Sequence, residues 1–229
     1  NATAGFSVVT YVGTGGTGGT VGHGLGIAPS LIIAKSRSAS RDWAVYHKDL
    51  TKDKYLNLNA TTGASTTTSV WGAAEPTSSV FGVYAWSTAQ NNANGENMVA
   101  YCFAPVVGYS SMGSYVGNGS STDGPFVYTG FRPRWILLKN ISDGYDGGGS
   151  IINSHSWVIY DTARGTYNAT GQILAPNKSF AEENNNTDID ILSNGFKLRT
   201  NRSAMNPGST QTMIYAAFAE SPFNYARAR

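Results

Sequence analysis

The sequence predicts an all-β protein built from two tandem, duplicated antiparallel β-sandwich modules of the jelly-roll kind. Three observations carry this prediction. The second half of the chain repeats the first, short apolar runs rich in β-branched and aromatic residues recur throughout, and Gly, Asn, Ser and Thr clusters separate them. Such runs are typical of strands and such clusters of turns. Many short strands at close spacing favour a sandwich over a parallel sheet.

The duplication appears as a nearly constant offset between matching residues. Tyr11-Val-Gly-Thr-Gly returns as Tyr115-Val-Gly-Asn-Gly, 104 positions later. The offset becomes 114 at Trp43 and Trp157, because the second copy carries an inserted loop at residues 143–150. Further matched pairs are Pro29 and Pro133, Lys35 and Lys139, Phe81 and Phe196, and Phe103 and Phe218.

The repeat places a module boundary near residue 106. We therefore expect a first β-sandwich module over residues 1–106 and a second over 107–229, each of a size that can fold unaided. The two copies differ most in the middle. Residues 51–77 are rich in Thr and Ala, whereas residues 177–190 of the second copy are acidic and rich in Asn. A site built from that region need not be shared by both modules.

Four pairs of strands are predicted, in the same order in each copy. They cover residues 30–35 and 134–139, 43–46 and 157–160, 80–84 and 195–199, and 98–103 and 212–218. In the second pair a Trp and a Tyr stand three residues apart, which places them on opposite faces of a strand. We expect the Trp in the core and the Tyr at the rim. The only helical candidate is a short turn at residues 179–183.

Composition excludes several classes of function. Charged residues make up 13% of the chain, the net charge is +2 and no Lys/Arg cluster occurs, which argues against a nucleic-acid partner. No apolar run is long enough for membrane insertion. The single cysteine, Cys102, stands in an apolar run and is expected to be a buried, inert thiol.

The repeated segments resemble a tandem module of bacteriophage virion proteins, especially fibre-like proteins of marine phages. In these proteins each copy opens with Gly-aromatic-Ser, present here at Gly5 and Gly108, and continues with the Tyr-Val-Gly-X-Gly, Pro-entered and Trp-X-hydrophobic-Tyr segments. Each copy closes on an Asn-Gly or Asn-Pro-Gly turn and a Phe-Ala pair. The resemblance covers essentially the whole chain. It implies a concanavalin-like, lectin-type sandwich and brings no catalytic motif.

Motifs for nucleotide, metal or nucleophilic chemistry are weak. The run at residues 13–18 fits Gly-X-Gly-X-X-Gly, but no helix can begin after it, so we expect a hairpin loop and not a phosphate site. The three histidines lack the spacing of metal ligands. No Gly-X-Ser-X-Gly stands in a suitable context for a serine nucleophile.

The densest carboxylate cluster runs from Glu182 to Asp190. Asp188 and Asp190 would share one face if they lie on a strand, although residues 182–188 have the composition of a polar loop. A facing pair of carboxylates is what glycoside hydrolysis needs. Oxygen ligands from Asp188 and Asp190, with Asn184 and Asn186, would also suit Ca²⁺. No cofactor is expected; a weak calcium site and a glycosidase pair are the alternatives.

Unduplicated aromatic residues are the better candidates for ligand contact, because the fold itself explains the duplicated ones. Tyr145 stands between Asp143 and Asp146 in the inserted Gly-rich loop, and Trp135 has Leu31 as its counterpart. Sugar rings stack on aromatic faces, while carboxylates and amides bind their hydroxyl groups. We therefore predict ligand binding by Asp143, Tyr145, Asp146 and Trp135. A plain surface insertion is the alternative.

These observations and the resemblance together lead to three functional hypotheses. The first is a non-catalytic virion surface or fibre protein, extracellular, whose partners are copies of itself, other virion proteins and a host-surface glycan. The second is a purely structural assembly protein, such as a capsid decoration, fibre shaft or filament subunit. The third is an enzyme that cleaves glycans with Glu182, Asp188 or Asp190.

Overall fold

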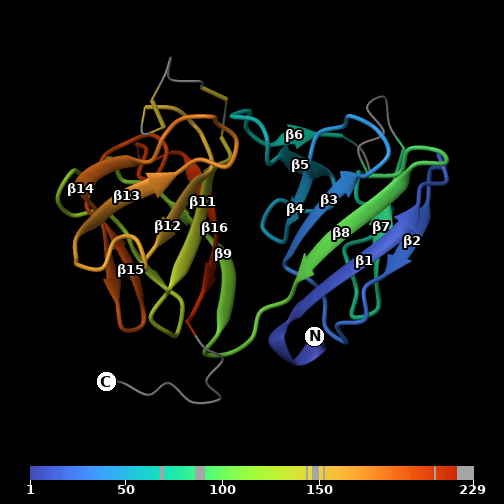
Figure 1. The fold of residues 1–229 in the computed structure, drawn as a ribbon, viewed down its shortest axis with the longest axis horizontal. Coiled ribbons are helices and arrows are strands. Elements are labelled where there is room, and N and C mark those ends of the chain that lie inside the picture. Colours follow the sequence, from blue (N-terminus) through green and yellow to red (C-terminus); the bar gives the residue numbers. More distant parts are fainter. Residues whose placement is uncertain are drawn as a thin grey trace. The chain divides into compact units, whose positions relative to one another are not determined.

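The computed structural model describes residues 1–67, 70–85, 91–142, 144–145, 150–151, 153–208 and 210–220, and their side chains except those of residues 185–187. The chain forms two compact units (Figure 1). The first comprises Asn1–Asn59 and Ala64–Val106, and the second comprises Ala60–Gly63 and Val107–Arg229. Among the described residues the sole helical element is a 3-10 turn, η1 (Ala2–Ala4). Every strand pair is antiparallel, which confirms the all-β prediction.

In the first unit the strands form a six-stranded sheet and a two-stranded sheet. The larger sheet has the order β1-β8-β3-β4-β5-β6, and β2 pairs with β7. The strands are β1 (Phe6–Val12), β2 (Gly19–Gly22), β3 (Leu31–Ser36), β4 (Ala44–His47), β5 (Lys54–Asn57), β6 (Ser65–Thr66), β7 (Val80–Val83) and β8 (Asn97–Phe103).

In the second unit eight strands form one sheet of order β10-β15-β14-β13-β12-β11-β16-β9. The strands are β9 (Ser110–Val116), β10 (Phe126–Tyr128), β11 (Trp135–Asn140), β12 (Val158–Asp161), β13 (Thr170–Leu174), β14 (Glu183–Leu192), β15 (Gly195–Leu198) and β16 (Thr212–Phe218). Strand for strand this is the order of the first unit. The difference is that the ten-residue β14 bridges β13 and β15, whereas the two-residue β6 pairs with β5 alone.

The strand registers of the two units agree residue by residue. Leu31 pairs with Phe103 in the first unit, and Trp135, 104 positions after Leu31, pairs with Phe218 in the second. The same agreement holds where Ile32 pairs with Tyr46 and Ile136 with Tyr160. Because a slip of one residue would turn every side chain to the other face, the shared register means that both units bury equivalent positions.

Each unit closes over one apolar core. In the second unit the rings of Tyr115 on β9 and Phe196 on β15 meet edge to face, 6.2 Å apart between centroids. These strands stand near opposite ends of the sheet order, so the sheet folds back on itself and buries its inner face. In the first unit the same contact joins Tyr11 and Phe81 at 6.3 Å.

The Tyr-Val-Gly-X-Gly repeat has a structural role in this closure. The Tyr115 hydroxyl donates to the carbonyl oxygen of Met205 at 2.6 Å. Gly117 approaches the segment that follows so closely that a Cβ at this position would lie 2.1 Å from the carbonyl oxygen of Pro207. Only glycine fits there. In the first copy the same roles fall to Tyr11 with Asn91 and to Gly13 with Ala93.

Three sequence-based expectations about local structure are wrong. The turn expected at residues 179–183 is not helical, and the polar stretch expected as a loop over residues 182–188 mostly belongs to β14. Pairing with two neighbouring strands outweighs the low β propensity of this stretch. Tyr46 and Tyr160 belong to the cores, not to the rim, because they pair across from inward-facing isoleucines. Of the matched tryptophans, Trp157 is buried as expected, whereas Trp43 is only half-buried.

The glycine run after Tyr11 forms the connection between β1 and β2, as expected of a hairpin loop. The described residues contain no helix that is long and apolar enough to cross a membrane.

Candidate functional site

Tyr145 is the described part of the predicted recognition loop, since Asp143 and Asp146 lie outside the described residues. Its side chain is 58% exposed, and its ring meets the buried His155 ring edge to face at 6.1 Å. The Tyr145 carbonyl oxygen accepts a hydrogen bond from the His155 backbone N–H at 2.7 Å. The aromatic ring is thus both accessible and braced from beneath.

Lys139, at the end of β11, anchors this region from inside the second unit. Its side chain is fully buried, and its Nζ donates to the carbonyl oxygens of Thr61, Asn140 and His155 at 3.0, 2.8 and 2.7 Å. Three acceptors match the three hydrogens of the ammonium group. The duplicated strand-ending lysine of the first unit, Lys35, also donates to a backbone carbonyl, that of Arg41.

Trp135 lies at the opposite end of β11 from the segment that leads to Tyr145. Five residue steps separate Trp135 from Asn140, a length of about 17 Å in a strand. The Trp135 ring is half-buried and packs against Phe218, with 5.7 Å between centroids. The structure therefore does not bring Trp135 and Tyr145 into one site.

Asp188 and Asp190 lie on β14, and each carboxylate binds an arginine. Arg202 Nε is 3.3 Å from Asp188 Oδ1, and Arg199 Nε is 2.6 Å from Asp190 Oδ2. Asp188 is only 1% exposed, and burial raises the pKa of its carboxyl above the ordinary value, against the opposing effect of Arg202. A calcium ion at this pair would have to displace both guanidinium groups. Within the described part of the chain, no three His, Cys, Asp or Glu side chains gather in a group suited to a metal ion.

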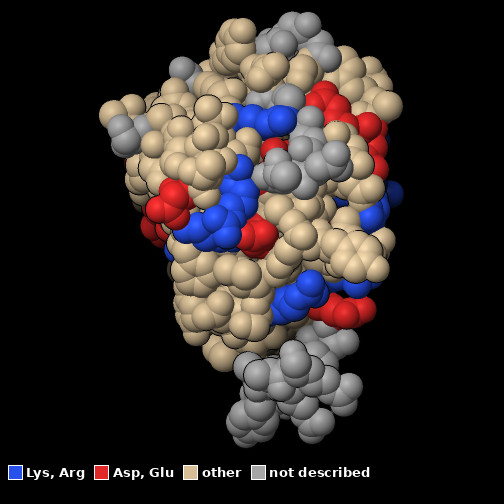
Figure 2. Space-filling model, turned by 90° about the vertical axis from the view of Figure 1, so that its left-hand side faces the viewer, with Lys and Arg blue, Asp and Glu red and all other residues tan. Residues whose placement is uncertain are grey.

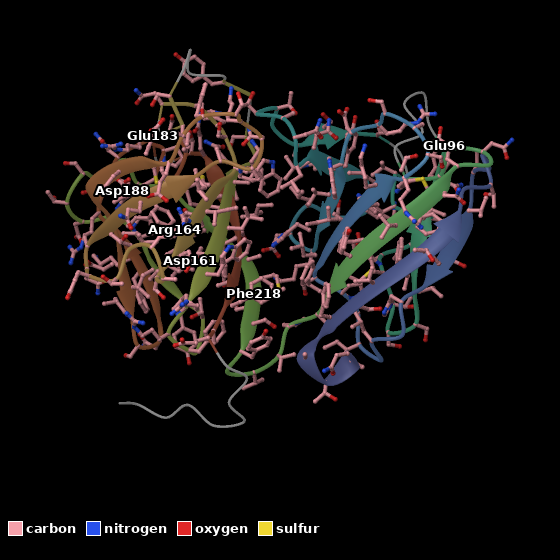
Figure 3. All side chains as sticks on the ribbon, in the orientation of Figure 1. Glu96, Asp161, Arg164, Glu183, Asp188 and Phe218 are labelled. Atoms are coloured by element: carbon pink, nitrogen blue, oxygen red, sulfur yellow. The ribbon has the colours of Figure 1, made fainter. Side chains whose placement is uncertain are left out.

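The two arginine–aspartate pairs belong to a larger set of ion pairs in the second unit. Figure 2 shows basic and acidic side chains next to one another on the side where β13, β14 and β15 lie, and Figure 3 labels Asp161, Arg164, Glu183 and Asp188 there. The other pairs are Arg134 with Asp161 at 3.6 Å, Arg134 with Glu220 at 3.3 Å, Arg164 with Glu182 at 2.7 Å and Lys197 with Asp123 at 2.5 Å.

Five of these charged residues have uncharged counterparts in the first unit, whereas Asp190 corresponds to Glu75. The described ion pairs of the first unit, Arg41–Glu96, Lys48–Asp49 and Lys52–Asp53, lie at other positions. By the sequence offset and the shared registers, Arg134, Asp161 and Arg164 correspond to Ser30, His47 and Leu50. Likewise, Lys197 and Arg199 correspond to Gly82 and Tyr84. The scaffold is therefore shared by the two units, whereas the arrangement of these ion pairs differs between them.

Sequence reasoning missed two exposed aromatic residues, Phe126 and Tyr128, on the edge strand β10. The signal that would have found them is the one applied to Trp135 and Tyr145, namely an aromatic residue without an aromatic counterpart. The short run Phe126-Val-Tyr was not recognised as a strand, so its alternation of exposed and buried residues was not considered.

A protein-family model matches nearly the whole chain. A family model described as "Domain of unknown function (DUF7483)" matches residues 1–222. The curated proteins contain no match. Among solved structures, "Crystal Structure of the STIV MCP" aligns at 7% identity over 93% of this chain and 85% of that chain, with a TM-score of 0.27, too low to carry an argument. On the family match, this chain belongs to the DUF7483 family.

Proposed function

We propose that this protein is a non-catalytic surface or fibre component of a virus particle that contacts host-surface glycans, with recognition carried by its second unit. One observation supports this most directly: the two units repeat the same scaffold and register, yet the ion pairs Arg134–Asp161, Arg164–Glu182 and Lys197–Asp123 of the second unit are not repeated at the equivalent positions of the first. Packing of the fold explains the features that both units share. A surface feature that differs between the units is not required by the fold and can therefore bind a partner. The resemblance to phage virion modules supports the location on a virus particle.

Binding of this kind would be weak at each site and strengthened by display of many copies on one particle. Exposed ion pairs contribute little to stability, about 0–1 kcal/mol each, so stability alone gives little reason for so many. Linked copies raise the effective concentration of the second binding event and can increase overall avidity by about 10²–10⁴-fold. We expect no hydrolysis of the bound glycan, since Asp188 is buried against Arg202 and Asp190 binds Arg199.

A bead-binding assay tests this proposal. The protein would be displayed on fluorescent beads and passed over a panel of immobilised bacterial envelope polysaccharides. Glu182→Cys, in an ion pair of the second unit, and Lys48→Cys, in an exposed ion pair of the first unit, allow a bulky maleimide-linked polymer to be attached. We expect the polymer at residue 182 to block retention and the polymer at residue 48 to leave it intact. Absence of retention of the unmodified protein on every polysaccharide would contradict the proposal.

A purely structural assembly role is favoured by a different observation. β1 and β9 each end a sheet, each is seven residues long, and neither contains a charged residue. Native proteins usually protect such edges with charges or prolines, because an open edge can pair with another chain. If assembly through β1 is the main role, the protein forms ordered oligomers in sedimentation experiments, and Val8→Lys dissolves them.

A further inference from the structure

The geometry points to a saccharide-binding site on the outer face of β10, β15 and β14, with Phe126 and Tyr128 as an aromatic platform. This inference rests on the proposed glycan contact and specifies both its place and its ligand class, a neutral saccharide. The site lies on the edge strand β10 and not in the loop that contains Tyr145.

The two rings of the platform stand on one exposed face of β10. Phe126 and Tyr128 are 46% and 67% exposed, while Val127 between them is buried in the core. Residues two apart on a strand share a face, so both rings stand on the outer face with their Cα atoms about 7 Å apart. Since β10 ends the sheet, nothing in the sheet order covers the outer side of this strand.

The backbone adds hydrogen-bonding groups beside the rings. Leu198 N–H donates to the Pro125 carbonyl oxygen, and Thr129 N–H donates to that of Asn194. In an antiparallel pair the residues alternate between bonding inward and pointing away, so the N–H and C=O groups of Phe126 and Tyr128 point to the open side of the edge. They stand ready for hydroxyl groups of a ligand that lies on the rings.

Gly195 holds the platform in shape. It pairs directly with Tyr128, and a Cβ at this position would lie 3.1 Å from two atoms of the Phe126 ring and 2.1 Å from the Val127 carbonyl oxygen. The Phe126 ring therefore lies over the glycine, supported on one side and open on the other. A ring that is already in place loses little conformational freedom when a ligand binds.

The charges of the polar side chains beside the platform cancel one another. Lys197, which pairs with Phe126 on one side and Asp190 on the other, binds the Asp123 carboxylate. Arg199 binds Asp190. Two cations and two carboxylates leave no net charge, and Lys197 lowers the pKa of the Asp123 carboxyl, which stays ionised at neutral pH. Such a row offers donors and acceptors to hydroxyl groups without favouring an anionic ligand.

The first unit has the equivalent edge strand, β2, but lacks the two aromatic rings. Val21 and Phe81 pair there as Val127 and Phe196 do in the second unit, so the registers assign Thr20 and Gly22 to the positions of Phe126 and Tyr128. The platform is thus specific to the second unit.

A protein partner fits these dimensions less well than a sugar. Two aromatic side chains bury at most about 500 Å², whereas stable protein interfaces bury about 1,200–2,000 Å². A three-residue strand also provides few backbone bonds for pairing with another strand. A pyranose ring, in contrast, can stack on a single aromatic side chain while its hydroxyl groups bind polar neighbours.

The test uses the full chain, displayed on beads, with neutral glucan, galactan and mannan oligosaccharides and with alginate as the acidic probe. We expect retention on at least one neutral oligosaccharide and not on alginate alone. Phe126→Ala and Tyr128→Ala should each weaken it about 3- to 10-fold, the range of an aromatic contact. Tyr145→Ala is the matched control, an exposed tyrosine of the same unit outside the platform. Thermal unfolding of each variant checks that it is folded.

The outcomes separate this inference from the proposed function. Saccharide binding that survives both platform substitutions, or that Tyr145→Ala abolishes, overturns the platform and leaves the proposed function standing. A preference for alginate overturns the neutral ligand class. Loss of self-association by Tyr128→Ala, with saccharide binding unchanged, assigns the surface to a protein partner and also overturns the inference. Failure of the unmodified protein to bind any saccharide overturns the proposed function itself.

Discussion

Asn92 and Asn206 stand 114 positions apart in the sequence and perform the same task in the two units. The Asn206 Oδ1 accepts from the Asn118 backbone N–H at 2.9 Å, and its Nδ2 donates to the Ser120 carbonyl oxygen at 3.0 Å. In the first unit Asn92 makes the same pair of bonds, to Thr14 N–H at 2.9 Å and to the Gly16 carbonyl oxygen at 3.0 Å. Both side chains are fully buried. Each asparagine binds the loop that follows the first strand of its unit (β1 or β9) to the segment that precedes the last strand (β8 or β16).

Replacing this asparagine is expected to be costly. Asn206→Ala removes the partner of the part-buried Asn118 N–H and Ser120 carbonyl groups and of the buried Thr200 carbonyl oxygen, which accepts from the same Nδ2 at 2.8 Å. A buried group left without a partner costs about 1–3 kcal/mol. We expect the free energy of unfolding to fall by about 2–4 kcal/mol in urea denaturation. Asn201→Ala, at an exposed position of the same segment, is the matched control and should change it by less than about 0.5 kcal/mol. Equal effects of the two substitutions would show that the buried bonds do not matter.

Gly117 offers a test of close backbone packing. In Gly117→Ala the new Cβ would lie 2.1 Å from the Pro207 carbonyl oxygen, so the backbone must move. We expect a loss of about 1–3 kcal/mol in the free energy of unfolding, as for other overpacked sites. At Gly208 a Cβ meets nothing within 4 Å, and Gly208→Ala should be tolerated. The comparison is a pair of thermal melts, and an undisturbed melting temperature for Gly117→Ala would refute the steric argument.

Arg202→Met tests the buried pair with Asp188. Without its partner the buried carboxylate should cost about 3–5 kcal/mol of stability at neutral pH. Because burial raises the pKa of Asp188 in the folded state, ionisation opposes folding, and the penalty is greatest above that pKa. As the pH falls through the raised pKa, Asp188 takes up a proton and the variant should recover relative to the unaltered protein.

The control for this pair is Arg199→Met, which removes the partner of the more exposed Asp190 and should cost no more than about 1 kcal/mol. Urea denaturation at several pH values between neutral and about 4 measures both variants. A penalty for Arg202→Met that does not diminish with acidification would contradict a buried, ionised Asp188.

Cys102 should be inert in the folded protein. Its side chain is fully buried, and burial raises the pKa of the thiol to about 12. A thiol-specific reagent at neutral pH should therefore react only when the first unit unfolds, and fully in denaturant. Rapid labelling of the native protein would show that β8 opens easily or that the thiol is accessible.

Much of the scaffold follows from the sequence, because the duplication compares every strand with a second copy of itself. The matched pairs Lys35 with Lys139 and Phe103 with Phe218 predict the shared register of β3 with β8 and of β11 with β16. β14 escaped prediction, because its polar residues become a strand only through pairing with β13 and β15.

The site was less predictable than the scaffold for the same reason. The spacing of Asp188 and Asp190 correctly placed both on one strand, but nothing near them in sequence shows that Arg202 and Arg199 would bind them. Trp135 and Tyr145 are close in sequence, yet β11 holds them apart. Local patterns predict elements, whereas a site depends on which distant elements become neighbours.

The equal registers have a consequence for valency. Thr20 and Gly22 are exposed and stand where Phe126 and Tyr128 stand in the second unit, and a Cβ at Gly22 meets only the Ser79 carbonyl oxygen, at 3.9 Å. Val80 stands at the position of Gly195, so three substitutions, Thr20→Phe, Gly22→Tyr and Val80→Gly, would give one chain two aromatic platforms. A few side chains, and not the number of folded units, then set how many binding sites a chain offers to a polymer. The number of sites per chain could thus double or halve in evolution with no change of fold.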